Sequence, residues 1–215
     1  MQIIECDQGG ELWHQSRCGA ITASMFSVAR ERLKTGANKG DFSAKAKDYA
    51  FRVAVERISN QPLDEGFETW AMKRGHELEP MARFEHELET GVFVQKAGFV
   101  LSEDGKFGAS ADGLINEDGG VEYKCLVSPE RLRNILLTGD ISEFLDQIMG
   151  GMWLTGRAWW HFCLYCPALE PIGKQFWMRH VNRDDDYINV LEQDLIQFEK
   201  LVSQYEQTLR IGAAA

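Results

Sequence analysis

The sequence has few cysteines and no long hydrophobic run, and both absences narrow the class of protein. The five cysteines, at positions 6, 18, 125, 163 and 166, are an odd and widely spaced set, which argues against a disulfide framework. No stretch approaches eighteen apolar residues, so no transmembrane helix is expected. The first residues show neither the basic nor the apolar region of a secretory signal. We therefore expect a cytoplasmic protein with reduced cysteines and no membrane association.

Proline is also scarce, and no linker rich in proline, glycine and serine divides the chain. There are five prolines among 215 residues, and no repeat of fixed period is visible. The hydrophobic share of 44% is enough to build a sizeable core, which excludes a disordered or fibrous chain. The length suits one larger domain better than two small ones, so we expect a single domain over residues 1–215.

Basic residues are fewer than acidic ones, and the basic residues are unevenly distributed along the chain. The chain has 23 Lys and Arg against 33 Asp and Glu, a formal net charge of −10. Residues 17–57 nevertheless hold nine basic and four acidic residues, so this quarter is basic while the rest is strongly acidic. Such polarity permits phosphate binding on one face, although a solvated helical surface explains the charge pattern equally well.

The hydrophobic spacing predicts helices first, then strands, then helices again. Ser24 and Ser43 are each expected to cap a helix, over 25–33 and 44–58, because each precedes helical apolar spacing. Short β-branched and aromatic runs then predict a β-meander, with a turn at 117–120. This order indicates an α/β or α+β fold with a central mixed sheet. The other expected helices are 70–89, 129–137, 141–154 and 188–209, and the expected strands are 91–101, 106–115, 120–127, 158–166 and 174–181.

The residues best suited to chemistry lie in the meander. Glu122 and Lys124 point to the same face of a strand because side chains alternate, with Tyr123 on the other face. If Asp112 begins the preceding hairpin arm, its carboxylate reaches Glu122, and two close carboxylates repel unless a cation lies between them. Mg²⁺ or Mn²⁺ suits such an all-oxygen site, and Lys124 could then orient or deprotonate a water. The plainer alternative is an exposed hairpin with an ordinary Glu–Lys pair.

Two residues outside the meander are candidates for the same site. Glu79 shares a helix face with Gly75 and Ala82, and these small neighbours would let the helix approach the sheet and direct Glu79 inward. Gln147 lies among small and apolar residues of an expected buried helix and needs hydrogen-bond partners there. The alternatives are a solvent-exposed carboxylate and a core amide with ordinary partners.

Several motifs in order along the chain resemble those of the bacteriophage lambda exonuclease and YqaJ-type viral recombinase family. Residues 13–24 (WHQSRCGAITAS) are similar to the family's opening signature WHxxRxGxITAS. Residues 75–79 match its helical glutamate motif, and 110–114 match SPDGL with Ala111 in place of proline. Residues 122–125 match ExKC, although Leu126 follows where lambda exonuclease has proline, and Gln147 with residues 152–153 matches its Q…MW helix.

The resemblance implies a PD-(D/E)xK nuclease core and magnesium-dependent, processive 5′→3′ digestion of one strand of double-stranded DNA from its ends, leaving 3′ overhangs. Asp112 and Glu122 would then be metal ligands together with the Tyr123 carbonyl, and two Mg²⁺ ions are expected, with Mn²⁺ as a substitute. Lys124 would activate water, and Glu79 and Gln147 would complete the catalytic set. Arg17, Ser24 and Ser110 match positions that hold a 5′-phosphate. The implied context is a toroidal homotrimer of phage or prophage origin, acting in the bacterial cytoplasm with a single-strand annealing protein.

Rival interpretations remain open at this stage. A PD-(D/E)xK endonuclease that cuts internally as a dimer, or a non-catalytic DNA-end-binding recombination protein, could carry several of the same residues. Cys163 and Cys166 have the CxxC spacing of an iron–sulfur ligand pair, but they lie in an apolar strand, which favours buried thiols. The heptad-like stripe over 188–209 favours a helix packed on its own domain over a coiled coil between chains.

Overall fold

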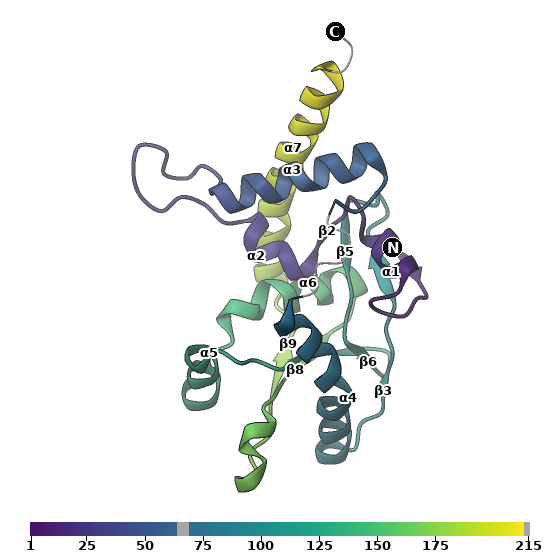
Figure 1. The fold of residues 1–215 in the computed structure, drawn as a ribbon, viewed down its shortest axis with the longest axis vertical. Helices are drawn as coiled ribbons and strands as arrows, with labels where there is room; N and C mark the ends of the chain where they lie inside the picture. The colour runs from purple at the N-terminus through teal and green to yellow at the C-terminus, as the bar shows by residue number, and fades with distance from the viewer. Residues whose placement is uncertain (64–68, 213–215) are drawn as a thin grey trace.

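The fold, a computed structural model, is described for residues 1–63 and 69–212 (Figure 1). Three elements precede the first one expected from the sequence: a strand, a helix and a second, short strand. The helices are α1 (Glu11–Arg17), α2 (Phe26–Ala29), α3 (Ala44–Ser59), α4 (Trp70–Thr90), α5 (Pro129–Arg133), α6 (Leu145–Thr155) and α7 (Asp185–Gly212). The strands are β1 (Gln2–Ile4), β2 (Ile21–Thr22), β3 (Val94–Gln95), β4 (Phe99–Leu101), β5 (Phe107–Ala109), β6 (Gly113–Ile115), β7 (Gly119–Lys124), β8 (Trp159–Tyr165) and β9 (Phe176–Asn182).

Helix caps explain where two of the long helices begin and end. The Ser43 side chain accepts a hydrogen bond from the Ala46 N–H, and Thr69 does the same for Met72, so α3 and α4 each begin at a side-chain cap. Gly91, with φ of 70°, closes α4 in the left-handed conformation that glycine adopts without strain. The expectation for Ser24 was wrong, because it lies inside the short turn η1 (Ala23–Met25) and caps nothing.

The expected meander is divided between two sheets. A five-stranded sheet has the order β3-β6-β7-β8-β9, and a four-stranded sheet has the order β1-β4-β5-β2. Residues 91–101 were expected to form one strand, but they form β3 and β4, which belong to different sheets. The chain crosses between them at Gly98, where any Cβ would collide with the carbonyl oxygen of Ile4. The expected turn is also shorter, because β7 begins at Gly119.

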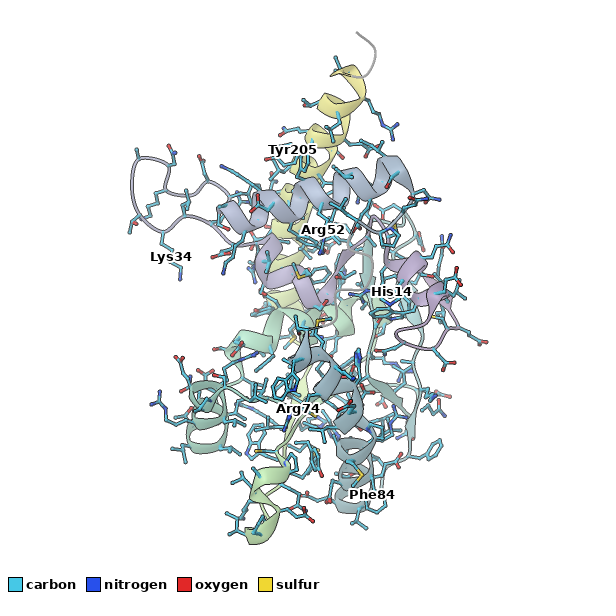
Figure 2. All side chains as sticks on the ribbon, viewed as in Figure 1. His14, Lys34, Arg52, Arg74, Phe84 and Tyr205 are labelled. Atoms are coloured by element: carbon cyan, nitrogen blue, oxygen red, sulfur yellow. The ribbon has the colours of Figure 1, made fainter. Side chains whose placement is uncertain are left out.

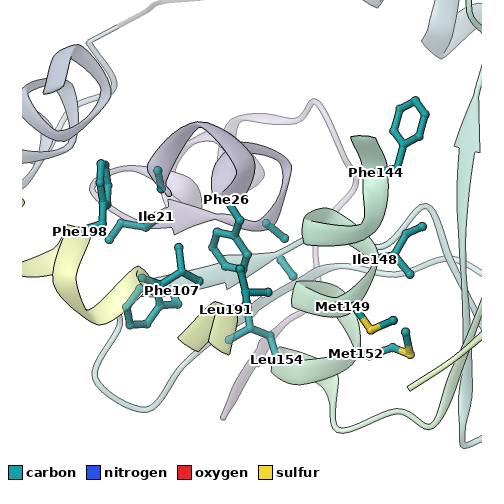
Figure 3. Close-up of a cluster of buried hydrophobic side chains, with 14 of the residues drawn as sticks. Ile21, Phe26, Phe107, Phe144, Ile148, Met149, Met152, Leu154, Leu191 and Phe198 are labelled. Carbon is teal, nitrogen blue, oxygen red and sulfur yellow. The ribbon is translucent and has the colours of Figure 1, made fainter. Parts of the chain in front are cut away.

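The helices cover the sheets so that α4 and α6 can both reach β7 and β8. α4 contacts β7, β8 and β9, while α6 contacts β5 and β8. α6 also lies very close to α2, because Gly150 has no side chain where the Phe26 ring packs (Figure 3). Both aromatic and aliphatic side chains from α2, α6 and α7 are fully buried in this core, which fixes α6 rigidly.

The C-terminal helix packs on its own chain. Ile188, Leu191, Leu195, Phe198 and Val202 are at most 3% exposed, and α7 lies against α3 and α6. The preference for a helix packed on its own domain is therefore confirmed for this stripe. Within the described residues, the longest helices are not apolar enough to cross a membrane.

A chain of buried hydrogen bonds lies behind β7, on the face opposite Glu122. The Tyr123 hydroxyl is 2.9 Å from His86 Nδ1, and His86 Nε2 is 2.9 Å from His161 Nδ1. His161 Nε2 is then 3.2 Å from Nδ1 of the exposed His180. Burial lowers the pKa of both His86 and His161 to about 4, because an imidazolium is poorly solvated there.

These lowered pKa values predict a loss of stability in mild acid. Between pH 6.5 and pH 4 the unfolded chain binds more protons at these histidines than the folded chain does, so the free energy of unfolding falls as the pH falls. We expect the two groups together to contribute about 2–4 kcal/mol of this loss by pH 5. Thermal unfolding of wild type and His161→Gln at pH 7.5 and pH 5 tests it: the variant should lose less than wild type. Equal losses in both proteins, with exposed His14→Gln as the control, would contradict the prediction.

Candidate active site

The residues expected to do chemistry line one cavity of about 570 Å³. It is enclosed by the N-terminal half of α4, the end of β7, α5 and the start of α6. Its polar lining includes all five expected catalytic residues, Asp112, Glu122, Lys124, Gln147 and, on α4, Glu79. The lining includes Ser24, Met72, His76, Glu79, Asp112, Glu122, Lys124, Cys125 and Gln147.

Asp112 is held at the start of β6 by the neighbouring strand. Its main-chain N–H donates to the Val121 carbonyl at 3.2 Å, and its Oδ2 accepts from the Tyr123 N–H at 2.7 Å. These bonds confirm the hairpin geometry in which Asp112 faces the Glu122 strand. Burial raises the pKa of Asp112 well above its usual range, and the charges of Glu122 and Glu79 raise it further. A carboxyl group in this position therefore favours an added cation.

Glu122, Lys124 and Gln147 form one hydrogen-bonded cluster. Lys124 Nζ lies 2.6 Å from Glu122 Oε1 and 3.1 Å from Gln147 Oε1. The Gln147 amide also donates to Glu122 Oε1 at 2.6 Å, so all three groups meet at one carboxylate oxygen. Burial works against the Lys124 ammonium, but the charges of Glu122 and Asp112 outweigh it and raise the pKa of Lys124. The alternative of an exposed Glu–Lys pair is wrong, because the Glu122 residue is only 4% exposed.

Glu79 reaches the cavity from the small-residue face of α4. Ala82 on that face is fully buried, whereas Trp70, Met81 and Leu88 on the bulky side are exposed. Burial raises the pKa of Glu79, and the nearby charge of Arg83, 3.9 Å away, opposes the increase. The structure therefore brings Glu79 to the same cavity as Asp112, as expected, and does not leave it as a solvent-facing carboxylate.

Arg17 lies in a second cavity of about 680 Å³ that adjoins the first. Its guanidinium carbon is 4.1 Å from the centre of the Trp13 ring, and Nη1 is 3.4 Å from Ser110 Oγ. The Trp13 indole N–H also donates to Ser110 Oγ at 2.8 Å. Ser24 lines both cavities. Burial lowers the pKa of Arg17 to about 10, so its cation is poorly solvated and an anion placed beside it would be favoured.

Three contributing residues were not singled out from the sequence. Trp13 stacks on Arg17 because both lie on α1, and the i,i+4 spacing in WHQSR was the available signal. Arg74 donates to the Cys125 carbonyl at 2.8 Å, and Arg83 donates to the Asp112 carbonyl at 3.0 Å. The two arginines therefore join α4 to the backbone at Asp112 and at Cys125, next to Lys124, and no local pattern could reveal these contacts.

The donor groups allow a hard cation with only a few protein ligands. Within residues 1–63 and 69–212, no group of three or more His, Cys, Asp or Glu side chains is arranged to hold a metal ion. Asp112 and Glu122 nevertheless supply oxygen donors, and burial together with the charges of Glu122 and Glu79 raises the pKa of Asp112, so a nearby cation would favour its carboxylate form. Mg²⁺ keeps several waters and binds through one or two carboxylates, so the set fits Mg²⁺ better than a metal that needs a full protein cage.

The cysteines show no sign of chemistry. Burial raises the pKa of Cys125 to about 11, so its thiol stays protonated beside the cavity. Cys163 and Cys166 are both buried and are not bridged to each other, as expected for core thiols. Burial also raises the pKa of Cys163.

The basic quarter of the chain is less free than its charge suggests. Arg30 pairs with Asp146 at 2.7 Å and also donates to Asp194. Nη1 and Nη2 of Arg57 each lie 2.9 Å from a carboxylate oxygen of Glu199. These arginines attach α2 and α3 to α6 and α7 and are not available to phosphates. The part of the segment that projects into solvent is the loop 31–42, with Lys34 near its outer end (Figure 2).

Comparison with known proteins identifies similar folds over nearly the whole chain. Residues 12–158 match the YqaJ-like viral recombinase domain. The crystal structure of the alkaline exonuclease LHK-Exo from Laribacter hongkongensis is 29% identical, with a TM-score of 0.81 over 95% of this chain and 98% of that chain. LHK-Exo in complex with dAMP gives 28% identity and a TM-score of 0.83, with the same coverage of both chains.

A more distant structure shares the fold alone. The phage related exonuclease from Haemophilus somnus 129PT is 16% identical, with a TM-score of 0.66 over 89% of this chain and 95% of that chain. No curated protein matches the sequence. The expected PD-(D/E)xK core, a mixed sheet flanked by helices, is confirmed by these neighbours.

Proposed function

The chain belongs to the YqaJ-like viral recombinase family, and from this we propose that it is an exonuclease that digests one strand of double-stranded DNA from a 5′ end. Its similarity to LHK-Exo, an alkaline exonuclease, supports the general role of a DNA exonuclease. The observation that carries the proposal is the adjacency of two sites. The cavity lined by Asp112, Glu122, Lys124 and Gln147 shares Ser24 with the cavity that Arg17 lines, and Arg17 Nη1 lies 3.4 Å from Ser110 Oγ.

The chemistry follows from the cluster. Asp112, Glu122 and the Tyr123 carbonyl would hold Mg²⁺, which supplies an activated water and neutralises charge on the scissile phosphate. Lys124 is hydrogen-bonded to Glu122 and places a cation where negative charge develops on the phosphate. Gln147 fixes the orientation of both groups by donating to Glu122 and accepting from Lys124.

The proton state of Lys124 depends on its neighbours. Glu122 and Asp112 hold its pKa high, so the side chain orients water as an ammonium while they are free. A cation held by those carboxylates would weaken their stabilisation of the ammonium, and burial would then act to lower the pKa of Lys124. In that state Lys124 could accept a proton from the attacking water.

The direction of digestion rests on the second cavity. A 5′-phosphate carries up to two negative charges, and Arg17 offers a desolvated cation with Ser24 and Ser110 hydroxyls nearby. Because 5′→3′ cleavage leaves a new 5′-phosphate on the shortened strand, the pocket would be refilled after each step. Such refilling would make digestion processive and would leave 3′ single-stranded overhangs.

One experiment separates this function from its two rivals. Linear duplex labelled at its 5′ or 3′ ends and a closed circular duplex are incubated with protein and Mg²⁺. Early release of the 5′ label with an intact circle is expected. A cut circle would favour the internally cutting PD-(D/E)xK endonuclease, and binding without any release would favour the non-catalytic end-binding protein.

Arg83→Gln should raise the Mg²⁺ concentration that gives half-maximal activity by about tenfold. Arg83 donates to the Asp112 carbonyl, and a hydrogen bond from a charged group contributes about 1.5–3 kcal/mol to placing that residue. Arg157→Gln is the matched control, because Arg157 donates to the Ile115, Asn116 and Gly119 carbonyls at the far end of the same hairpin. The control should change thermal stability but not the Mg²⁺ requirement. A shift of equal size in both variants would show that only hairpin stability matters.

The assembly completes the proposal. The whole chain would act as one nuclease domain in a toroidal homotrimer, with the loop 31–42 and the start of α3 facing the DNA. Lys34, Lys39, Lys45 and Lys47 are the cations that this arrangement would direct to phosphates. A single-strand annealing protein in the bacterial cytoplasm would receive the overhang. Sedimentation showing only monomer while digestion stays processive would rule out the ring.

A further inference from the structure

A third cavity, outside the catalytic site, lies at the N-terminal end of α4. It measures about 450 Å³ and is lined by Trp70, Lys73, Arg74, Glu77, Leu78 and Pro167, the last from η4 (Pro167–Ile172). Resting on the function proposed above, we infer that this cavity binds single-stranded DNA, namely the strand that is not digested. A nucleobase would stack on Trp70 while the backbone phosphates lie near Lys73 and Arg74.

Trp70 is exposed to a degree that folding alone does not explain. It is 69% exposed, whereas the other five tryptophans are all partly or fully buried. An indole left in water is a stacking surface for any base, and such stacking contributes affinity without selecting a sequence. The residue therefore has the character of a platform for single-stranded nucleic acid.

The charges around Trp70 favour a phosphate backbone. Lys73 and Arg74 outnumber the one acid in the lining, Glu77, on a chain whose formal net charge is −10. An exposed aromatic ring beside two cations can bind a base and the phosphates of its backbone together. The remaining wall, Leu78 and the Pro167 ring, is apolar and suits the flat surface of a base.

The cavity adjoins the catalytic cavity along α4. Ala71 and Met72, which follow Trp70, line the catalytic cavity, and so does Cys125. Arg74 spans the two, because it lines the Trp70 cavity and donates to the Cys125 carbonyl at 2.8 Å. A DNA strand that separates from its partner beside Lys124 would therefore have only the first residues of α4 to pass before it meets the Trp70 indole. In Figure 2, Arg74 lies above Phe84 along α4.

Binding to a base can be separated from binding to a backbone with two probes. Fluorescent (dT)12 and the same length of abasic oligonucleotide are titrated in EDTA, where cleavage cannot interfere, against wild type, Trp70→Ala and Trp70→Phe. Wild type should bind (dT)12 about tenfold more tightly than the abasic oligonucleotide, because one base–aromatic stack contributes about that much affinity. Trp70→Ala should lose that preference and Trp70→Phe should retain most of it. The affinity of Trp70→Ala must fall for (dT)12 and stay unchanged for the abasic oligonucleotide.

Phe84→Ala is the matched control. Phe84 is an exposed aromatic residue, 56% exposed, on the same helix but toward its other end (Figure 2). It should leave both affinities unchanged. Equal weakening by Phe84→Ala, or an unchanged base preference in Trp70→Ala, overturns the inference and assigns the indole to a protein contact. Release of 5′ label from duplex by the wild type is measured separately, so failure of the exonuclease proposal is distinguished from failure of this one.

Discussion

Lys124→Ala is expected to lower the rate of duplex cleavage by about 10²–10³-fold while duplex affinity changes little. Lys124 lies in the centre of the cluster, 2.6 Å from Glu122 and 3.1 Å from Gln147, where the proposed mechanism places charge that develops only in the transition state. Removing one preoriented donor of this kind typically has an effect of that size. Duplex affinity comes from phosphate contacts spread over many residues, so it should persist.

Asp112→Asn gives the comparison that interprets the lysine variant. Asp112 supplies an oxygen to the proposed metal site, so its loss should weaken Mg²⁺ binding as well as activity. Lys124→Ala should leave Mg²⁺ binding intact or stronger, because an ammonium that competes for Glu122 Oε1 has gone. Calorimetry with Mg²⁺ and a single-turnover cleavage assay measure the two effects. Wild-type turnover in Lys124→Ala, or undiminished metal affinity in Asp112→Asn, would contradict the assignment of the site.

Arg17→Ala should remove most of the preference for 5′-phosphorylated ends. The Arg17 cation is buried against Trp13, and its pKa is lowered to about 10, so a bound phosphate dianion would be strongly favoured beside it. A charge-assisted hydrogen bond contributes about 1.5–3 kcal/mol, which corresponds to about 10- to 150-fold in the ratio of rates on phosphorylated and hydroxyl ends. Digestion runs should shorten as well, since the pocket would be refilled at each step.

A charge-matched control tests whether the site or the charge matters. Arg210 pairs with Glu206 on the exposed end of α7, so Arg210→Ala removes one positive charge far from the cavity. It should keep the wild-type ratio of rates. Trp13→Phe removes the indole donor to Ser110 but keeps an aromatic ring beneath Arg17, so an intermediate ratio is expected. If Arg17→Ala keeps the wild-type ratio, the phosphate pocket lies elsewhere.

Local patterns predicted the elements well where the stabilising contact is itself local. Ser43 caps α3 through a hydrogen bond to a residue three positions away, and the alternation along β7 places Glu122 and Lys124 on one face. The small-residue face of α4 was also correct, because Gly75, Glu79 and Ala82 are neighbours by helical spacing alone. Ser24 failed as a cap because packing of Phe26 against α6 shapes that turn, and sequence spacing does not report such a contact.

By itself the sequence determined the motifs, the faces on which Glu79, Glu122 and Lys124 lie, and the basic character of residues 17–57. Only the tertiary structure decided which groups meet: Gln147 with Glu122, Trp13 and Arg17 with Ser110, and Arg83 with the Asp112 carbonyl. It also decided which charges are already used, since Arg30 and Arg57 are paired with acids of α6 and α7. The physical reason is one of range. Helix periodicity, strand alternation and caps act over a few residues, whereas these contacts join segments 25 to 164 positions apart through the packing of the whole chain.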